Sequence, residues 1–284
     1  MNQDASPHIA LIGGGNMARA LIGGLLRQGH PAQHLCVGEP QPDARAFLER
    51  QFAVRTAADN EAAIEDAALV ILAVKPQVAA QVLQPLQQSL QARRPVLLSI
   101  VAGLRIADLA RLCPPGLPIV RAMPNRAALV GAGISGLYAP AIVTAAQRVM
   151  AERVARAAGP IVWLRDESQL DIVTALSGSG PAYFFLLAEQ LAQAAVALGL
   201  DRDTALLLAT ETLHGAGALS QGAMSLAEQR AAVTSRGGTT EAALKALDAG
   251  GFDALVASAV RAAAARSAEL ADSLAATLSS KPGA

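Results

Sequence analysis

Cysteine is nearly absent from this chain, whose 284 residues include only Cys36 and Cys113. The sequence contains no C-x-x-C pair and no cluster of cysteine with histidine. It therefore predicts neither a disulfide framework nor a zinc site, and it indicates no metal centre of another kind. Two isolated thiols are typical of a reducing compartment, so we expect a cytoplasmic protein.

An excess of one charge is missing as well, because 23 Lys and Arg residues balance 23 Asp and Glu residues. No field over the whole molecule then attracts nucleic acid or an anionic membrane, and we expect neither as a partner. Aromatic residues make up only 3% of the chain, whereas hydrophobic residues make up 52%. This composition excludes disorder and requires a core of aliphatic side chains and alanine.

Signals for export and for membrane insertion are also lacking. The N-terminus is polar and has Asp4 where a signal peptide would be positively charged. The longest stretch without charge, residues 127–147, is interrupted by glycine, serine and proline. That stretch predicts a strand, a turn and the start of a helix instead of a membrane span.

Short apolar runs alternate with helical patterns in the first part of the chain, which predicts an α/β domain with a parallel sheet covered on both faces. The predicted strands are residues 8–12, 35–38, 54–55, 68–74, 96–100, 119–122, 133–138 and 161–164, and the helices are 43–51, 60–66, 76–90 and 144–157. Long Ala/Leu helices follow, over residues 168–198, 202–217, 225–233, 240–249 and 252–278. We expect two domains, residues 1–165 and an all-helical domain over 166–284.

A glycine pattern, Gly13-x-Gly15-x-x-Ala18, follows the first predicted strand and opens a helix. In this context Gly13 permits a tight turn, Gly15 lets the backbone approach a pyrophosphate, and Ala18 allows close packing on the sheet. The N–H groups of the helix start favour phosphate. The pattern predicts a dinucleotide site in a Rossmann-like domain, against the alternative of a glycine turn without a ligand.

Two residues after the second strand leave the choice of dinucleotide open. Glu39 stands near the offset at which an acid accepts a hydrogen bond from the ribose 2′-hydroxyl, which favours NADH. The alternatives are that Glu39 is a solvated loop acid and that Arg45 meets the 2′-phosphate of NADPH.

Other segments suit cofactor and substrate. Lys75 follows the fourth strand, at the edge of the sheet where open α/β sheets bind ligands, although it also suits a surface lysine. Residues 177–181 (Ser-Gly-Ser-Gly-Pro) interrupt an apolar helix, and residues 233–240 precede a helix that Thr239 or Thr240 would cap. A packing kink and a linker are the simpler readings, but together these segments predict amides that hold a small anionic substrate.

Nucleophilic chemistry has no recognisable motif here, since there is no G-x-S-x-G elbow, P-loop or catalytic carboxylate pair. His214, alone on an apolar helix, is expected to be packed or hydrogen-bonded. Hydride transfer from a nicotinamide remains, because the cofactor supplies that reactivity.

Several ordered motifs together resemble the pyrroline-5-carboxylate reductase family, the last enzyme of proline biosynthesis, over nearly the whole chain. They are residues 12–18 (IGGGNMA), 73–77 (AVKPQ), 121–125 (RAMPN), 174–185 (TALSGSGPAYFF), 233–235 (VTS) and 237–240 (GGTT). The resemblance implies an oxidoreductase that uses NADPH or NADH to reduce the C=N bond of 1-pyrroline-5-carboxylate to L-proline. It also implies a homodimer joined through the helical domain, with larger oligomers built from dimers.

The motifs and the resemblance, carried over by position, together assign expected roles to particular residues. Thr240 is the catalytic residue, whose hydroxyl is proposed to hydrogen-bond the imine nitrogen. The substrate-binding residues are Ser177, Ser179, Gly180, Pro181, Ser235, Gly237, Gly238 and Thr239. The cofactor-binding residues are Gly13, Gly15, Asn16, Met17, Glu39, Asn60, Ala73, Val74, Lys75, Pro76, Ala102, Gly103 and Asn125.

Arg126-Ala127 and Arg236 depart from the family, which usually has Thr-Pro and Pro there. The loop at Arg236 is then less preorganised, or its guanidinium engages the substrate carboxylate. These departures keep open a dinucleotide-binding regulatory protein without catalysis. A β-hydroxyacid-type dehydrogenase is a further alternative, but Lys245 lacks the glycine-rich setting of its catalytic lysine.

Overall fold

The computed structural model describes residues 6–280, so Asp4 lies outside the described residues. Its backbone contacts divide the chain into two units. The first runs to Gly178 and resumes at Ala263, and the second is Ser179–Ala262. The first unit thus includes segments that follow residue 165, and the expected domain boundary near that residue stays a prediction.

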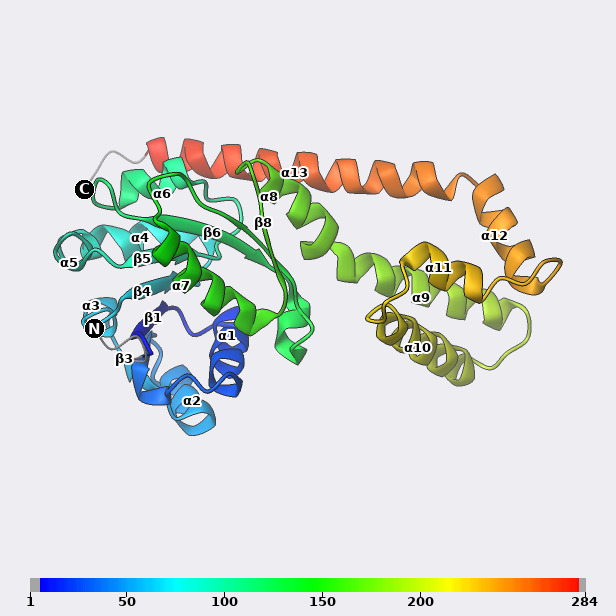
Figure 1. Cartoon of the computed structure of the whole chain (residues 1–284), viewed down its shortest axis with the longest axis horizontal. Coiled ribbons are helices and arrows are strands. Elements are labelled where there is room, and N and C mark those ends of the chain that lie inside the picture. The colour runs from blue at the N-terminus through cyan, green and yellow to red at the C-terminus, as the bar shows by residue number, and fades with distance from the viewer. Residues whose placement is uncertain (1–5, 281–284) are drawn as a thin grey trace. The chain divides into compact units, whose positions relative to one another are not determined.

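An eight-stranded sheet forms the centre of the first unit (Figure 1). Its strands, all at or near the predicted runs, are β1 (Ile9–Ile12), β2 (Leu35–Gly38), β3 (Arg55–Ala57), β4 (Leu69–Leu72), β5 (Val96–Ser99), β6 (Ile119–Pro124), β7 (Ser135–Tyr138) and β8 (Ile161–Trp163). The spatial order is β3-β2-β1-β4-β5-β6-β7-β8. This order, with β1 beside both β2 and β4, confirms the Rossmann-like arrangement.

One strand pair corrects the expectation of a parallel sheet, because β6 and β7 are antiparallel whereas the other neighbouring strands are parallel. Only residues 125–134 connect these two strands, and they hold a single 3-10 turn, Arg126–Val130. A parallel crossover needs a dozen or more residues. The short connection therefore fixes the reversed direction of β7.

Both faces of the sheet are buried, which explains the continuous apolar strands. Alternate residues such as Leu11 and Ile71 join a core with helices α1 (Asn16–Arg27), α2 (Pro42–Phe52) and α7 (Ala145–Ala155). Ala10 and Val70 face the second core, which contains Ile64 at the end of α3 (Asn60–Ala63) and residues of α4 (Ala79–Leu83), α5 (Gln87–Arg93) and α6 (Ile106–Leu112). Burial on both sides of strands such as β1, β2, β4 and β5 is the main force that holds this unit together, whereas the edge strands β3 and β8 are partly exposed.

Two helical segments differ from expectation. Helix α6 was not predicted, although Asp108, which bonds the amide of Arg105, and the buried Leu109 and Leu112 are a local signal for it. The predicted helix over residues 76–90 is divided by 3-10 turns at Pro76–Val78 and Gln84–Leu86, because each turn has a proline at its start.

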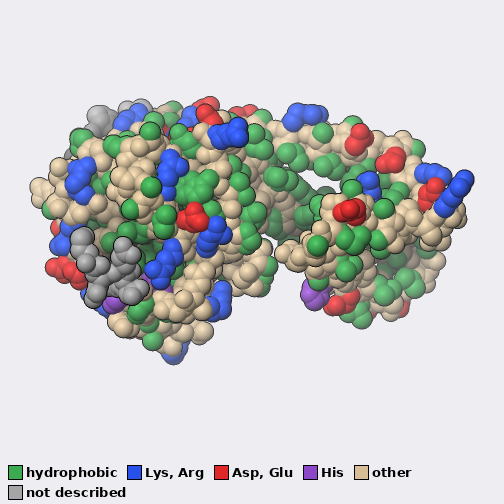
Figure 2. Space-filling model, viewed as in Figure 1, with side chains coloured by type: hydrophobic (Ala, Val, Ile, Leu, Met, Phe, Trp, Pro, Cys, Tyr) green, Lys and Arg blue, Asp and Glu red, His purple; other side chains and the backbone are tan. Residues whose placement is uncertain are grey.

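The second unit is helical, as expected, and has little core of its own. It contains α9 (Gly180–Ala197), α10 (Arg202–Leu219), α11 (Leu226–Ala232), α12 (Thr239–Ala249) and the first part of α13 (Phe252–Ser280). Hydrophobic side chains are visible on its surface (Figure 2). Among them, Phe184 is 60% and Leu255 68% accessible. By length and apolar composition, Gln169–Ala197 would suffice to cross a bilayer.

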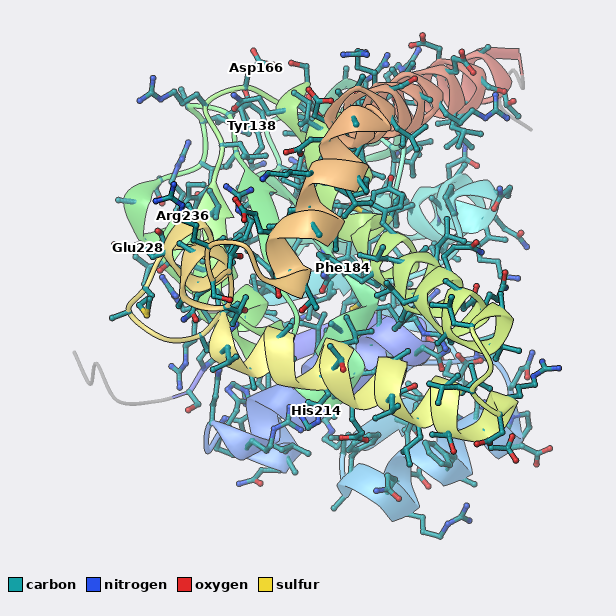
Figure 3. All side chains as sticks on the ribbon, turned by 90° about the vertical axis from the view of Figure 1, so that its right-hand side faces the viewer. Tyr138, Asp166, Phe184, His214, Glu228 and Arg236 are labelled. Carbon is teal, nitrogen blue, oxygen red and sulfur yellow. The ribbon has the colours of Figure 1, made fainter. Side chains whose placement is uncertain are left out.

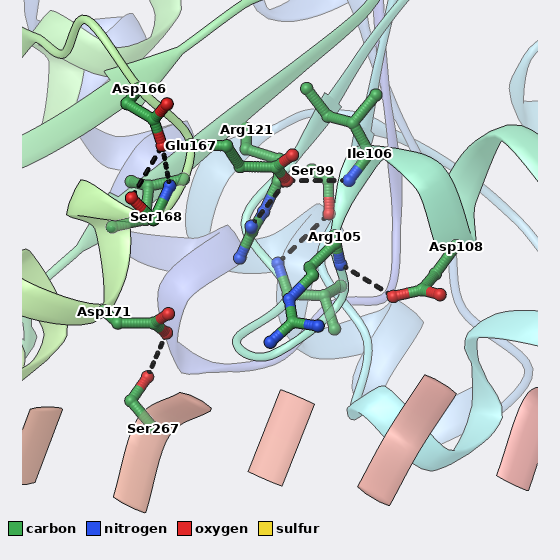
Figure 4. A network of polar contacts seen from close by, with 12 residues as sticks. Ser99, Arg105, Ile106, Asp108, Arg121, Asp166, Glu167, Ser168, Asp171 and Ser267 are labelled. Carbon is green, nitrogen blue, oxygen red and sulfur yellow. Dashed lines mark hydrogen bonds and ion pairs between the residues drawn. The ribbon is translucent and has the colours of Figure 1, made fainter. Parts of the chain in front are cut away.

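The end of α13 belongs to the first unit, where two polar side-chain contacts hold it beside a buried ion pair (Figure 4). Ser267 donates to Asp171 of α8 (Gln169–Val173), and Arg105 pairs with Asp272, each at 2.6 Å. Beside them, the buried Arg121 pairs with Glu167 at 2.7 Å, and the same Glu167 oxygen accepts from the amide of Ile106. Helix α13 is therefore anchored at the loop that follows β5 and at α8, which follows β8.

Candidate functional site

The loop after β1 lies where three strand ends meet. The amide of Gly13 donates to the carbonyl of Gly38 at 2.9 Å, so the ends of β1 and β2 are joined. Gly13 has φ of +98°, and a Cβ there would lie 2.8 Å from the carbonyl oxygen of Ala73 after β4. Only glycine fits this backbone angle and this close approach.

The start of α1 has the geometry of a phosphate site. Gly15 is the N-cap and has no side chain to bond the first-turn amides, and no atom lies within 4 Å of the place a Cβ would occupy. Gly15 and Asn16 are exposed, while Ala18 is buried against the sheet. Open space beside uncapped N–H groups suits the pyrophosphate of a dinucleotide.

Glu39 points at this loop from the end of β2. One carboxylate oxygen accepts the amide of Gly14 at 3.0 Å, and the other accepts the amide of Gln41 at 3.1 Å. Arg45 donates through one nitrogen, Nη1, to the carbonyls of Glu39 and Pro40, each at 2.9 Å. Asn60 lies beside the end of β2, because a Cβ on Gly38 would be 2.3 Å from the Oδ1 atom of Asn60.

The remaining cofactor candidates follow β4, β5 and β6. Lys75 is exposed and precedes the turn at Pro76. Gly103, at φ of +78°, packs under α13, since a Cβ on it would meet Leu274 at 2.9 Å. Asn125 is only 9% exposed, and its amide donates to the carbonyl of Ser177 and accepts from the amide of Ile134, both at 3.1 Å. The cofactor-binding roles of Gly103 and Asn125 stay predictions. Both residues also make contacts that hold the fold, Gly103 with α13 and Asn125 with residues 134 and 177.

The first hydroxyl segment interrupts the helix as predicted. Residues Thr174–Gly178 form a short π-helix between α8 and α9. The hydroxyl of Ser177 donates to the carbonyl of Val173 at 3.0 Å, and Gly178 leaves room for Met123. Ser179 is the N-cap of α9 but its side chain does not bond the helix amides. Asn125, through the Ser177 carbonyl, fixes this segment to β6.

The second hydroxyl segment is a tight turn before α12. The amide of Gly238 donates to the carbonyl of Ser235 at 3.0 Å, and Gly237 has φ of +72°, so Arg236 is at the first corner of the turn (Figure 3). The expected threonine cap is wrong, because Gly238 is the N-cap and no side chain caps the helix. Glu241 instead accepts the amide of Gly237 at 2.6 Å, which lowers the pKa of its carboxyl.

The two hydroxyl segments are far apart in one chain. The start of α9 and the turn before α12 lie at opposite ends of the helical unit (Figure 1). Within the described part of the helical unit, a single chain therefore does not bring the start of α9 and the turn before α12 together.

The histidines lie away from these segments. His214, expected to be packed or hydrogen-bonded, is 80% exposed at its side chain, and its Nδ1 lies 3.8 Å from a carboxylate oxygen of Glu211. The sequence did not predict the burial of His30, whose ring nitrogens have no hydrogen-bond partner among the described residues. Burial, and after it Arg153, lowers the pKa of His30. The described residues contain no group of three His, Cys, Asp or Glu suited to a metal ion.

Comparison with known proteins matches both parts of the chain. Residues 167–270 match the family model for pyrroline-5-carboxylate reductase dimerisation, and residues 8–103 match that for NADP oxidoreductase, coenzyme F420-dependent. The pyrroline-5-carboxylate reductase of Pseudomonas aeruginosa is 46% identical over 95% of this chain and 99% of its own, and that of Haemophilus influenzae is 42% identical over 92% and 97%.

Solved structures agree over the same length. A pyrroline-5-carboxylate reductase from Coxiella burnetii superposes with a TM-score of 0.90 at 38% identity, covering 94% of this chain and 99% of that one. The Plasmodium falciparum pyrroline carboxylate reductase with NADP bound has a TM-score of 0.78 at 27% identity, over 93% and 98%. On this evidence the chain belongs to the pyrroline-5-carboxylate reductase family.

Proposed function

We infer that this chain is an NAD(P)H-dependent oxidoreductase that reduces 1-pyrroline-5-carboxylate to L-proline. The observation that carries this conclusion is 46% identity to a pyrroline-5-carboxylate reductase over 95% of the chain. A glycine loop with open, uncapped amides at the start of α1 supports it. The reaction adds a hydride to the carbon of the C=N bond and a proton to its nitrogen.

The first unit would hold the dinucleotide. Residues 13–17 would bind the pyrophosphate through main-chain amides, and Glu39 and Asn60 would contact the adenosine ribose. Residues 73–76, 102–103 and 125 would support the nicotinamide half, at the ends of β4, β5 and β6. When bound, the reduced nicotinamide supplies the hydride, and the protein contributes its placement.

The two hydroxyl segments would hold the substrate. Main-chain amides and hydroxyls of residues 177–181 and 235–239 bind the carboxylate, and the hydroxyl of Thr240 hydrogen-bonds the imine nitrogen. A cyclic imine is basic enough to take its proton from solvent, so no strong protein acid is required. Holding the two reacting carbons roughly 3 to 3.5 Å apart contributes on the order of 7 to 11 kcal/mol.

The working form would be a homodimer in the cytoplasm, with larger oligomers built from dimers. Because the two hydroxyl segments are at opposite ends of the helical unit, a substrate held by both needs the first segment of one subunit and the second of its partner. The exposed apolar side chains of α9 and α10 give that partner a surface to cover, which accounts for the long apolar stretch 169–197 without a membrane. Light scattering at several concentrations tests the dimer.

One assay tests the reaction. Purified protein is mixed with 1-pyrroline-5-carboxylate and NADH or NADPH, and loss of the reduced nicotinamide absorbance is followed. Oxidation that depends on the imine, with proline as product, is the expected result. Cofactor binding without oxidation would indicate a regulatory protein, and oxidation of hydroxy acids with NAD or NADP would indicate a β-hydroxyacid-type dehydrogenase.

A further inference from the structure

The position of the Glu39 side chain bears on the choice that the sequence leaves open at the end of β2, between NADH bound through Glu39 and NADPH bound through Arg45. Its carboxylate is turned toward the glycine loop and accepts the amide of Gly14 at 3.0 Å. Its other oxygen accepts the amide of Gln41 at 3.1 Å, which fixes the carboxylate between the two loops. A negative charge is thus held at the strand end where the adenosine ribose of a dinucleotide lies.

We propose that Glu39 determines the dinucleotide specificity of this chain and makes it prefer NADH over NADPH. Each carboxylate oxygen accepts one amide and has a lone pair left for a further donor. The ribose 2′-hydroxyl of NADH supplies such a donor. The 2′-phosphate of NADPH supplies no donor when ionised and adds a charge of about −1.5 to −2 near a fixed anion. NADPH therefore loses a hydrogen bond and meets repulsion.

Arg45 is the cation that would reverse this preference, and its contacts argue against that role. Its Nη1 donates to the carbonyls of Glu39 and Pro40, so the guanidinium is held on the peptide that carries Glu39. The other nearby arginine, Arg19, is also engaged, because its Nε donates to the carbonyl of Gly14 and its guanidinium lies over the ring of Phe47. Both arginines brace the loops around Glu39.

Binding of the two dinucleotides, measured by titration calorimetry on the intact protein, tests this assignment. It rests on the proposed function only for the class of cofactor, and it needs no imine turnover, so it remains decisive if the reductase assay fails. We expect NADH to bind at least tenfold more tightly than NADPH, a difference of about 1.4 kcal/mol. Equal affinities, or tighter binding of NADPH, would overturn the proposal without any variant.

Three variants locate the cause. Glu39→Gln keeps an acceptor for Gly14 and removes the charge, so NADPH affinity should rise about tenfold while NADH affinity falls less than that. Asp43→Asn is the matched control, because Asp43 is an exposed acid in the first turn of α2. It should leave the ratio unchanged.

Arg45→Met should lower both affinities alike if Arg45 only braces the loop. A selective loss of NADPH in that variant, with an unchanged ratio in Glu39→Gln, would assign specificity to Arg45 and refute the role of Glu39. If Glu39→Gln weakens folding, seen as a lower melting temperature, Glu39→Ser provides the same removal of charge with a smaller side chain.

Discussion

The close approach of α1 to the turn after α7 predicts opposite effects from two neighbouring substitutions. A Cβ on Gly24 would lie 1.9 Å from the carbonyl oxygen of Ala157 and 2.6 Å from its carbon. Both groups belong to the backbone, so no side-chain rotation relieves the overlap. Gly23, one residue earlier, faces elsewhere: a Cβ there has Arg27 Nη1 at 3.4 Å and Phe52 Cε1 at 3.6 Å as its nearest neighbours.

The magnitudes decide the sign at each position. Replacing a helical glycine by alanine gains up to about 1 kcal/mol of helix propensity, whereas overpacking a tight core costs typically 1 to 3 kcal/mol and occasionally more. With an overlap of backbone on backbone, we expect Gly24→Ala to lower the free energy of unfolding by about 2 kcal/mol. Gly23→Ala should raise it by up to about 1 kcal/mol.

Urea unfolding at one fixed protein concentration measures both effects, because stability of an oligomer depends on concentration. Since α1 begins at the glycine loop, Gly24→Ala should also weaken dinucleotide binding, while Gly23→Ala leaves it unchanged. If both variants are stabilised to the same extent, α1 does not pack on Ala157 as described, and the reasoning fails.

Three further predictions concern catalysis, substrate binding and pH. Thr240→Ala should lower kcat about tenfold with little change in melting temperature, because one hydrogen bond to the imine nitrogen is lost; unchanged turnover would remove Thr240 from the mechanism. Arg236→Pro fits the first corner of its turn and removes a cation, so KM for pyrroline-5-carboxylate should rise about tenfold while 1-pyrroline, which has no carboxylate, is unaffected. An equal change for both substrates would exclude a contact with the carboxylate. Burial lowers the pKa of His30 in the folded state, so the unfolded chain takes up a proton on this ring at a higher pH than the folded protein does. The free energy of unfolding is therefore not reduced by His30 above about pH 6.5, and it decreases as the pH falls below that value. His30→Leu should flatten the dependence of melting temperature on pH in that range, and an unchanged slope would assign it to other groups.

The positions of the central strands were predictable because a strand buried on both faces has a continuous run of apolar residues. The direction of β7 was not, because it depends on the length and turn of residues 125–134 and not on the pattern of the strand itself. The cap of α12 was misassigned for a related reason. Gly238 takes that position because the turn at Ser235 places the chain there, and two adjacent threonines look equally suitable in sequence.

Contacts between side chains from distant segments explain the other features that the sequence did not predict. Asn125 bonds Ser177 and Ile134, and the buried ring of His30 lies beside His34 and Arg153. Each of these contacts joins residues that are distant in sequence and depends on the tertiary structure. A motif therefore indicates which residues have a role, but it does not show which atoms they bond. The choice between Glu39 and Arg45 was open in the sequence for this reason.

The helical unit of a single chain leaves apolar faces uncovered and its two hydroxyl segments apart. Helices α9 and α10 expose large apolar side chains, and a unit that cannot cover them alone gains stability from a second copy. The same unit has its two hydroxyl segments at opposite ends. A dimer contact could cover the apolar faces and also place the partner's second hydroxyl segment beside the start of α9. One contact would then both stabilise the unit and complete the substrate site. Substrate binding and self-association should therefore fail together in variants that disrupt the exposed faces of α9 and α10, whereas dinucleotide binding by the first unit should persist.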